Sequence, residues 1–201
     1  MVAIERDRRA LPALAEIADA AEGRLDVVEG DALEIDTASL GNGPRRIVAN
    51  LPYNVATPLL FAWLAKLKDF ESLTLMFQKE VAERITAQPN TKAYGRLAVM
   101  TQWVGEPKRL FDIPAQAFTP PPKVTSSVVR ITPRAAPELA DPKTMERVVA
   151  TAFNQRRKML RQALKPLGDA EVMLAKAGID PTRRAETLSV AEFAALAHAV
   201  Q

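Results

Sequence analysis

The segment Asn50-Leu51-Pro52-Tyr53-Asn54 combines residue types that can hold a weakly nucleophilic amine in front of a methyl donor. The lone pair of adenine N6 is delocalised into the ring, so this nitrogen must be held by acceptors with no strong charge nearby. The side-chain oxygen of Asn50 and the carbonyl of Leu51 are two such acceptors. Pro52 restricts the backbone, and Tyr53 offers a face on which an extruded base can stack. The alternative is a plain strand-to-helix turn, because Asn and Pro are both turn residues.

Methyl transfer of this kind needs no general base. A sulfonium methyl donor is intrinsically reactive, so positioning and polarisation can supply most of the catalysis. The sequence has no cysteine and a single histidine, His198. This composition excludes a thiol nucleophile, a disulfide framework, a zinc-thiolate site, a histidine triad and a multi-histidine metal site. We therefore expect no metal, and the lack of cysteine fits a reducing cytoplasm.

Two carboxylates stand at the ends of earlier predicted strands. Glu5 ends the apolar run 2–5, and Asp31 follows the run 25–29. Ligands of open parallel sheets bind beyond the carboxyl ends of the strands. Glu5 can accept both hydroxyls of a ribose, while Asp31 can accept the amino group of an adenine and Ala32 can donate a backbone N–H. Taken singly, each of these residues could instead be a turn former or a helix cap.

Hydrophobic periodicity places these residues in an α/β fold. Strands are predicted at 2–5, 25–29, 46–50 and 72–77, and helices at 7–22, 58–67 and 79–88. Strands and helices that alternate with short connections indicate a mostly parallel sheet covered by helices on both faces.

The pattern changes after residue 96. Strands are predicted at Leu97–Val104 and Ser126–Ile131, separated by a proline-rich loop, Pro114–Pro122, with no helix between them. They predict an antiparallel hairpin at the edge of the sheet. Four helices follow, at 142–154, 156–166, 169–177 and 189–199. We expect two domains, 1–134 and 138–201, joined through Thr132–Pro137.

Charge is distributed unevenly along a chain whose net charge is only +3. Residues 1–50 hold six basic and ten acidic residues, whereas residues 123–184 hold thirteen basic and six acidic ones. A basic C-terminal half indicates binding to a polyanion, although a solvated basic surface would give the same balance. No apolar run is long enough to cross a bilayer, and residues 1–9 lack the apolar core of a signal peptide.

Several stretches resemble the bacterial ribosomal RNA adenine dimethyltransferase family, and the resemblance covers essentially the whole chain. Besides residues 50–54, the similar stretches are Gly30–Leu33, Gln78–Arg84, Tyr94–Leu97, Phe118–Val129, Ala152–Lys158 and Arg184–Ser189. The most specific is Phe-Thr-Pro-Pro-Pro-Lys-Val-Thr-Ser-Ser-Val-Val at 118–129, which is similar to the family's loop before its last strand.

The resemblance implies a Rossmann-like class I methyltransferase sheet and a small, all-helical rRNA-binding domain. It implies dimethylation of N6 in two adjacent adenosines near the 3′ end of small-subunit (16S) rRNA, in ribosome maturation, with S-adenosyl-L-methionine as donor. Glu5 would then hold the donor ribose, and Asp31 and Ala32 its adenine. The immature small ribosomal subunit would be the partner of a monomeric, cytoplasmic protein.

The target base would lie against Asn50, which also borders the donor, and against Leu51, Pro52 and Tyr53. Phe118 would close the second face of this base, unless it only plugs the core beneath a loop. Ribosomal RNA would bind a basic helix, 154–165, and the loop lysine of the proline-rich stretch. These RNA-binding candidates are Arg156, Arg157, Lys158, Arg161, Lys165 and Lys123. The alternative for the basic helix is a solvated face.

The family's glycine-rich turn after the first strand has no counterpart in residues 1–10. In the usual strand order the strand before that turn is central, so its absence leaves sheet edges open and half of the donor site unbuilt. We expect an N-terminally truncated chain; the alternatives are a sheet that closes over the gap and a second chain that fills it.

Three other functions compete with this hypothesis. A large-subunit rRNA adenine methyltransferase shares the chemistry, and so does a DNA N6-adenine enzyme, although Leu51 differs from the proline usual in the latter. The third is a non-catalytic RNA-binding or ribosome-assembly fragment, which the missing glycine-rich turn favours and the intact 50–53 segment disfavours.

Overall fold

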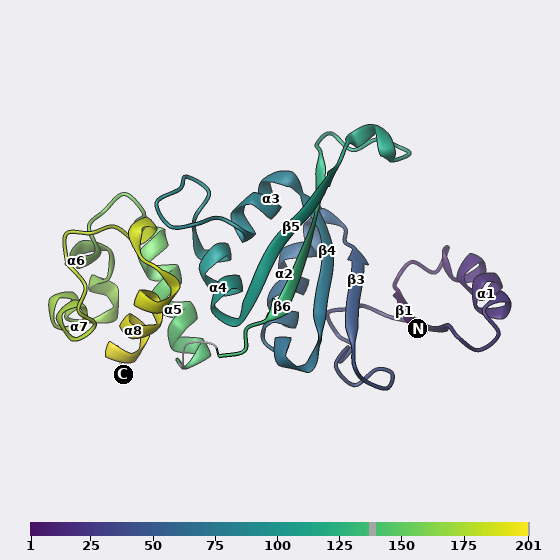
Figure 1. Cartoon of the computed structure of the whole chain (residues 1–201), viewed down its shortest axis with the longest axis horizontal. Coiled ribbons are helices and arrows are strands. Elements are labelled where there is room, and N and C mark those ends of the chain that lie inside the picture. Colours follow the sequence, from purple (N-terminus) through teal and green to yellow (C-terminus); the bar gives the residue numbers. More distant parts are fainter. Residues whose placement is uncertain (137–139, 201) are drawn as a thin grey trace.

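The computed structural model describes residues 1–136 and 140–200. Its strands are β1 (Val2–Glu5), β2 (Asp26–Glu29), β3 (Arg46–Asn50), β4 (Ser72–Gln78), β5 (Gly105–Ile113) and β6 (Ser126–Pro133). Its helices are α1 (Leu11–Ala20), α2 (Tyr53–Leu64), α3 (Lys79–Ile85), α4 (Arg96–Val104), α5 (Pro142–Asn154), α6 (Leu160–Ala163), α7 (Ala170–Lys176) and α8 (Val190–Ala199). Figure 1 shows α1 and β1 at one end of the molecule, the larger sheet in the middle and α5–α8 at the other end.

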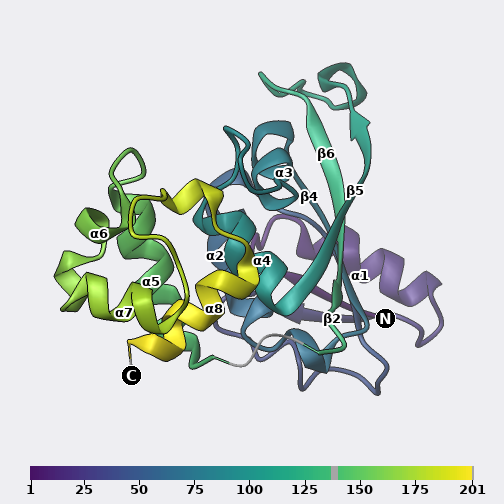
Figure 2. The same cartoon turned by 60° about the vertical axis from the view of Figure 1, so that its left-hand side comes forward.

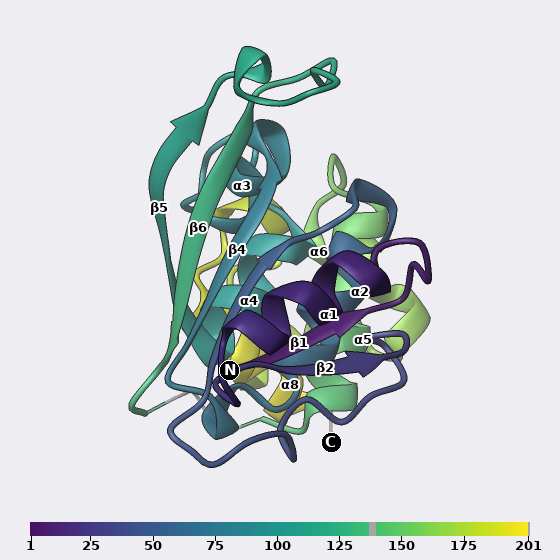
Figure 3. The same cartoon turned by 90° about the vertical axis from the view of Figure 1, so that its right-hand side faces the viewer.

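The strands form two separate sheets. β1 and β2 pair in parallel, with Glu5 opposite Glu29. The second sheet has the order β3-β4-β6-β5, in which β3 and β4 are parallel and the β4–β6 and β6–β5 pairs are antiparallel. Within the described residues no strand pairing joins the two sheets, and Val48 of β3 is 80% exposed. In Figure 3, β1 and β2 lie in front of the larger sheet, and α2 and α4 lie behind it.

The predicted edge hairpin exists, but its first strand is not where the sequence placed it. Residues 96–104 form helix α4, and the strand β5 follows at Gly105–Ile113. α4 is buried nearly all round, because it packs against the larger sheet's core on one side and against the C-terminal helices on the other. A helix buried on all sides shows no 3.6-residue period, which is why this apolar run resembled a strand.

We call the hairpin of β5 and β6, residues 105–133, the arm; it begins inside the larger sheet, and its loop end projects beyond the body of the molecule (Figure 2). β5 is mostly exposed and carries Pro107, which an edge strand tolerates because one side of its backbone faces solvent. Between Arg109 and Phe111 the pairing of β5 with β6 shifts register, so the outer part of the arm bends.

The C-terminal helices do not form a core of their own. Met145 and Val148 of α5 and Phe193 of α8 share one hydrophobic cluster with Val99 and Trp103 of α4. The division into domains 1–134 and 138–201 therefore remains a prediction, and its linker end, Pro137, and its first helical-domain residue, 138, lie outside the described residues. In the part of the chain that the structure describes, no helix has the length and apolar character needed to span a membrane.

The prediction of one helix over 156–166 is wrong in its bounds. Residues 155–158 form a turn closed by a hydrogen bond from Lys158 N–H to the Gln155 carbonyl (2.8 Å), and only Leu160–Ala163 is α-helical. The Arg156 guanidinium bonds Glu186 (2.6 Å) and the carbonyl of Thr91 (3.1 Å), contacts that draw the chain away from a continuous helix. Arg156, Arg157 and Lys158 are therefore displayed by a turn rather than by a helix face.

Candidate active site

The loop after β3 is fixed by its own backbone. β3 ends at Asn50, Leu51 is 8% exposed and packs into the core of the larger sheet, and Pro52 precedes the first turn of α2. The N–H groups of Val55 and Ala56 both donate to the Pro52 carbonyl at 3.1 Å. The order strand, buried leucine, proline and helix therefore holds this loop in one shape.

The Asn50 side chain is available to a ligand. It is exposed at the carboxyl end of β3, and it makes no hydrogen bond or ion pair with any described residue. An amide oxygen that is free, uncharged and next to the Leu51 carbonyl matches the acceptor pair expected for an exocyclic amine.

Tyr53, the first residue of α2, is oriented by the arm. Its hydroxyl lies 3.0 Å from Oγ of Ser126, a residue of β6 that is fully buried. The side chain of Tyr53 itself remains 38% exposed, so the ring keeps a face open to a base. The hydrogen bond fixes the ring at its far end, while the helix start fixes it at Cα.

A second set of contacts holds β5 and β6 together beside this tyrosine, near the loop end of the arm. Ser127 donates to Asp112 Oδ1 at 2.6 Å, Lys79 Nζ lies 3.0 Å from Asp112 Oδ2, and the Lys79 N–H donates to the carbonyl of Thr125 at 2.9 Å. The hydrogen bond from Ser127, and then the one from Lys79, lowers the pKa of Asp112 below its ordinary value. Asp112 is thus a carboxylate that ties β5, β6 and the start of α3 together.

Phe118 lies in the loop at the end of the arm. It follows the 3₁₀ turn Ala115–Ala117 and is half-buried. The ring–ring contacts of the described residues do not include one between Phe118 and Tyr53. The expected sandwich of the target base between these two rings stays a prediction.

The two carboxylates that the sequence predicts as donor contacts lie at the carboxyl ends of β1 and β2. Glu5 ends β1, and its carboxylate accepts the N–H of Asp7 at 2.6 Å. Asp31 follows β2; it accepts the N–H of Leu33 at 2.9 Å and pairs with Arg6 at 2.8 Å. Gly30 N–H donates to the Glu5 carbonyl at 3.0 Å, which ties the two strand ends together. Ala32 is next to Asp31 and packs partly against the core of the larger sheet.

These residues fit the nucleoside part of an S-adenosylmethionine-type donor. Half-buried carboxylates at the ends of neighbouring parallel strands can accept ribose hydroxyls and an adenine amine. The Arg6 partner of Asp31 is 75% exposed, so the pair is weak and a ligand can displace it. Asn50 lies in the other sheet, and the sequence 1–10 offers no glycine-rich turn for the methionine part.

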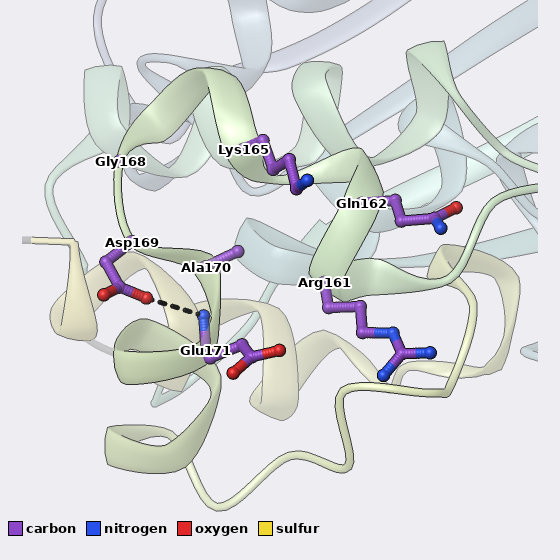
Figure 4. Close-up of a pocket in the computed structure, with 7 residues that line it drawn as sticks. All are labelled: Arg161, Gln162, Lys165, Gly168, Asp169, Ala170 and Glu171. Atoms are coloured by element: carbon purple, nitrogen blue, oxygen red, sulfur yellow. Dashed lines mark hydrogen bonds between the residues drawn. The ribbon is translucent and has the colours of Figure 1, made fainter.

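The basic RNA-binding candidates are spread over several elements rather than along one helix: the turn 155–158, α6, the 3₁₀ turn Lys165–Leu167 and the loop between β5 and β6. Figure 4 shows Arg161 of α6 and Lys165 beside a pocket of about 410 Å³ that Asp169 and Glu171 also line. Asp169 is occupied as the cap of α7, accepting the N–H of Glu171 at 3.1 Å. Lys123 is exposed in the loop between β5 and β6, and in Figure 2 the loop end of this hairpin lies apart from α6 and α7. The structure therefore groups Arg161 with Lys165 and leaves Lys123 apart.

The fold and the loop after β3 define a class of protein: a Rossmann-like methyltransferase. The whole chain, residues 1–201, matches the family described as ribosomal RNA adenine dimethylase, and the chain belongs to this family. It is 61% identical, over its full length, to the ribosomal RNA small subunit methyltransferase A of Rhodospirillum rubrum, of which it covers 70%. It is 59% identical to the protein of the same name from Rhizobium johnstonii, again over its full length and over 74% of that protein.

Solved structures support the fold. A dimethyladenosine transferase from Plasmodium falciparum matches 97% of this chain and 79% of its own length, with a TM-score of 0.81 and 24% identity. The 23S rRNA methyltransferase ErmE matches 99% of the chain and 81% of its own length, with a TM-score of 0.70 and 23% identity. At these identities the likeness extends to the fold, and the resemblance to the family found in the sequence is confirmed by the relatives above.

The sequence did not predict the residues that hold Tyr53 and the neighbouring strands in place. Ser126, Ser127 and Asp112 were not among the expected site residues, although the two serines stand inside the Phe118–Val129 stretch. A signal was present, because two adjacent serines open a strand that continues into the apolar Val128 and Val129, and buried hydroxyls need partners. Their partners, Tyr53 and Asp112, are distant in sequence and only the fold reveals them.

Proposed function

We propose that this protein transfers methyl groups from S-adenosyl-L-methionine to N6 of adenosine in small-subunit ribosomal RNA. The observation that carries the proposal is the loop after β3, with a free Asn50 amide beside an exposed tyrosine ring whose hydroxyl is held by Ser126. Family membership supports adenine in ribosomal RNA as the substrate class, and the relatives at 61% and 59% identity support the small subunit over the large one.

The residues of the chain act by holding the base. The Asn50 side-chain oxygen and the Leu51 carbonyl accept hydrogen bonds from N6, which favours a more tetrahedral nitrogen with its lone pair directed at the methyl group. The proton that each methyl group displaces from N6 passes to solvent. Tyr53 stacks on one face of the base, and such stacking is worth about 1–3 kcal/mol. When bound, the donor supplies an electrophilic methyl group. Catalysis therefore comes from the position of N6 and from the uncharged oxygens of Asn50 and Leu51, and no side chain has to act as a general base.

The finer parts of the proposal concern substrate and donor contacts. Two adjacent adenosines are each methylated twice, Phe118 closes the second face of the base, and Glu5, Asp31 and Ala32 hold the donor nucleoside. Arg156, Arg157, Lys158, Arg161, Lys165 and Lys123 contact the RNA backbone. The immature small ribosomal subunit in the cytoplasm is the partner of a monomeric protein.

Two measurements test this function. Calorimetric titration with S-adenosylmethionine establishes donor binding, and transfer of labelled methyl groups to immature small subunits establishes activity. Asn50→Ala should abolish transfer and spare RNA binding, whereas Asn42→Ala, in an exposed turn, should leave both unchanged. Full turnover by Asn50→Ala would contradict the assignment.

A second function is favoured by one observation. The donor carboxylates and Asn50 lie in sheets that share no strand pairing within the described residues. If the folded protein binds RNA but not the donor, it acts as an RNA-binding member of the family without methyl transfer.

A further inference from the structure

A basic groove lies between α2, the helix that begins at Tyr53, and the end of α5. It has a volume of about 830 Å³ and is bordered by α2, the end of α3, the segment 92–97 and the end of α5. Four cationic side chains line it: Arg84, Lys92, Arg96 and Arg156. No acidic residue of the described chain is among its lining residues. The groove therefore presents positive charge on several sides, as an anionic chain requires.

The carboxylates that pair with these arginines stand outside the groove. Arg96 pairs with Glu146 at 2.5 Å, Arg156 with Glu186 at 2.6 Å, and Arg84 with Glu80. A guanidinium has five N–H donors, so one carboxylate leaves donors free for a phosphate.

Lys92 differs from the three arginines. It is exposed, and within the described chain it makes no ion pair or hydrogen bond. The pocket of Figure 4, by contrast, mixes Arg161 and Lys165 with Asp169 and Glu171, so its charges offset one another. Of the two hollows, the groove is the better anion site.

The groove continues the face of α2 that carries Tyr53. Thr57 and Phe61 line it, and they stand four and eight residues after Tyr53 in the same helix. Residues spaced by four lie on one helix face and are separated by a rise of about 6 Å. A chain that leaves the base stacked on Tyr53 can therefore pass along α2 into the groove.

Aromatic side chains occur in the groove together with the cations. Arg96 lies over the Phe61 ring, with Cζ 5.5 Å from the ring centroid, and Phe153 is half-buried beside Tyr94 at a centroid distance of 6.1 Å. Cations interleaved with aromatic faces are typical of sites for single-stranded nucleic acid, where phosphates pair and bases stack.

We propose that this groove binds the sugar-phosphate backbone of the single-stranded RNA next to the target adenosine, with Lys92, Arg96 and Arg84 as phosphate ligands. The proposal rests on the proposed function, because it takes RNA as the substrate and Tyr53 as the position of the target base. It adds a path for the flanking nucleotides that runs from Tyr53 over Thr57 and Phe61.

The test uses the whole chain and a short fluorescent single-stranded RNA with two adjacent adenosines at its centre. Binding is measured by fluorescence anisotropy between roughly 50 and 200 mM salt, because each lost phosphate contact on a single strand flattens the slope of log K against log salt by about 0.7. Lys92→Ala should weaken binding several-fold and flatten the slope, and Lys92→Arg should restore both. Lys176→Ala, an exposed lysine at the end of α7, is the matched control and should match the wild type.

The possible results distinguish RNA binding in the groove from the proposed methyl transfer. Equal affinity and slope for Lys92→Ala and the wild type would overturn the groove, and so would a wild-type protein that does not bind this RNA. Wild-type binding that depends on Lys92, without methyl transfer to immature small subunits, would contradict the proposed function and support the groove.

Discussion

The Tyr53 hydroxyl lies 3.0 Å from Oγ of Ser126, although the two residues are 73 positions apart in the chain. Ser126 is fully buried and stands in β6, next to Ser127, which bonds Asp112 of β5. The loop that is proposed to hold the target base and the arm that carries Phe118 therefore belong to one hydrogen-bonded unit. A change at Ser126 or Ser127 should therefore alter the position of the tyrosine ring.

The first prediction concerns this hydrogen bond. Ser126→Ala removes the partner of the Tyr53 hydroxyl and should lower kcat for methyl transfer several-fold, since the ring loses its fixed orientation. Unfolding should become easier by about 1 kcal/mol, the usual net contribution of one such bond. The kcat is measured with saturating small subunits, and stability by urea denaturation.

Tyr53→Phe is the matched variant, because it keeps the stacking face and loses only the hydroxyl. It should resemble Ser126→Ala in kcat, while Tyr53→Ala should lose the stacking as well and be slower than either. Unchanged kcat in both Ser126→Ala and Tyr53→Phe would show that the bond does not position the ring.

The second prediction concerns pH and Asp112. The pKa of this carboxyl is held below its ordinary value of 3.8, first by the hydrogen bond from Ser127 and then by the one from Lys79. A lowered folded-state pKa stabilises the fold above the unfolded-state value, and this contribution disappears as pH falls through the lower folded value. The stability difference between the wild type and Asp112→Asn should therefore shrink as the pH is lowered from neutral to below 3.8.

Urea midpoints at a series of pH values provide this measurement. Asp19→Asn serves as the control, because Asp19 is exposed in α1 and its side chain makes no hydrogen bond or ion pair with a described residue. This variant should show no comparable trend. A wild-type advantage over Asp112→Asn that stays constant down to the acid limit would contradict the role of the ionised carboxylate.

The third prediction concerns Gly105, where α4 passes into β5. A Cβ at this position would stand 2.7 Å from Leu67 Cδ2, 2.8 Å from Ile131 Cγ2 and 3.1 Å from the Thr132 carbonyl oxygen. Gly105→Ala should destabilise the protein by about 1–3 kcal/mol, as overpacking usually does. Gly95→Ala is the control, because a Cβ there meets no atom within 4 Å. Equal denaturation midpoints for the two variants would refute the close packing.

Much of the sheet could be predicted from local pattern. β3 begins and ends where its apolar alternation begins and ends, Arg46–Asn50, and α5 was predicted at its observed bounds because Asp141 caps it and the apolar spacing is regular. α4 could not be predicted, because Ala98, Val99, Met100 and Thr101 are all buried and no polar face marks the helix. β5 was missed for the opposite reason: its residues are mainly exposed.

The candidate site also combines residues that the sequence identifies with residues that only the fold brings together. Asn50 and Tyr53 could be identified from their types and spacing, because the chemistry of a single loop is local. Arg96 and Lys92 could not be connected with them, since the groove forms only when α2, α4 and the end of α5 pack together. The turn at 155–158 cannot be told from a helix by local pattern, because the bond from Arg156 to Glu186 spans 30 positions and leaves no local signal.

The fourth prediction concerns the small sheet of β1 and β2. Among residues 1–30 only Leu25 is buried, and α1 has no buried residue, whereas β4 is buried along most of its length. Amide hydrogen exchange should therefore be much faster in β1 and β2 than in β4, because few apolar contacts oppose local opening. Mass spectrometry of exchanged peptides measures this difference, and equal protection in the two sheets would contradict it.

The separation of the two sheets has a consequence for repeated turnover. Two methyl groups on one nitrogen require two donor molecules, so the spent donor must leave before the second transfer. The proposed donor contacts are Glu5 and Asp31 on the small sheet, whereas the base contacts follow β3 and are tied to the arm. We therefore expect local opening of residues 1–30 to release the spent donor and admit a new one. The monomethylated adenosine would remain bound beside β3 during this exchange.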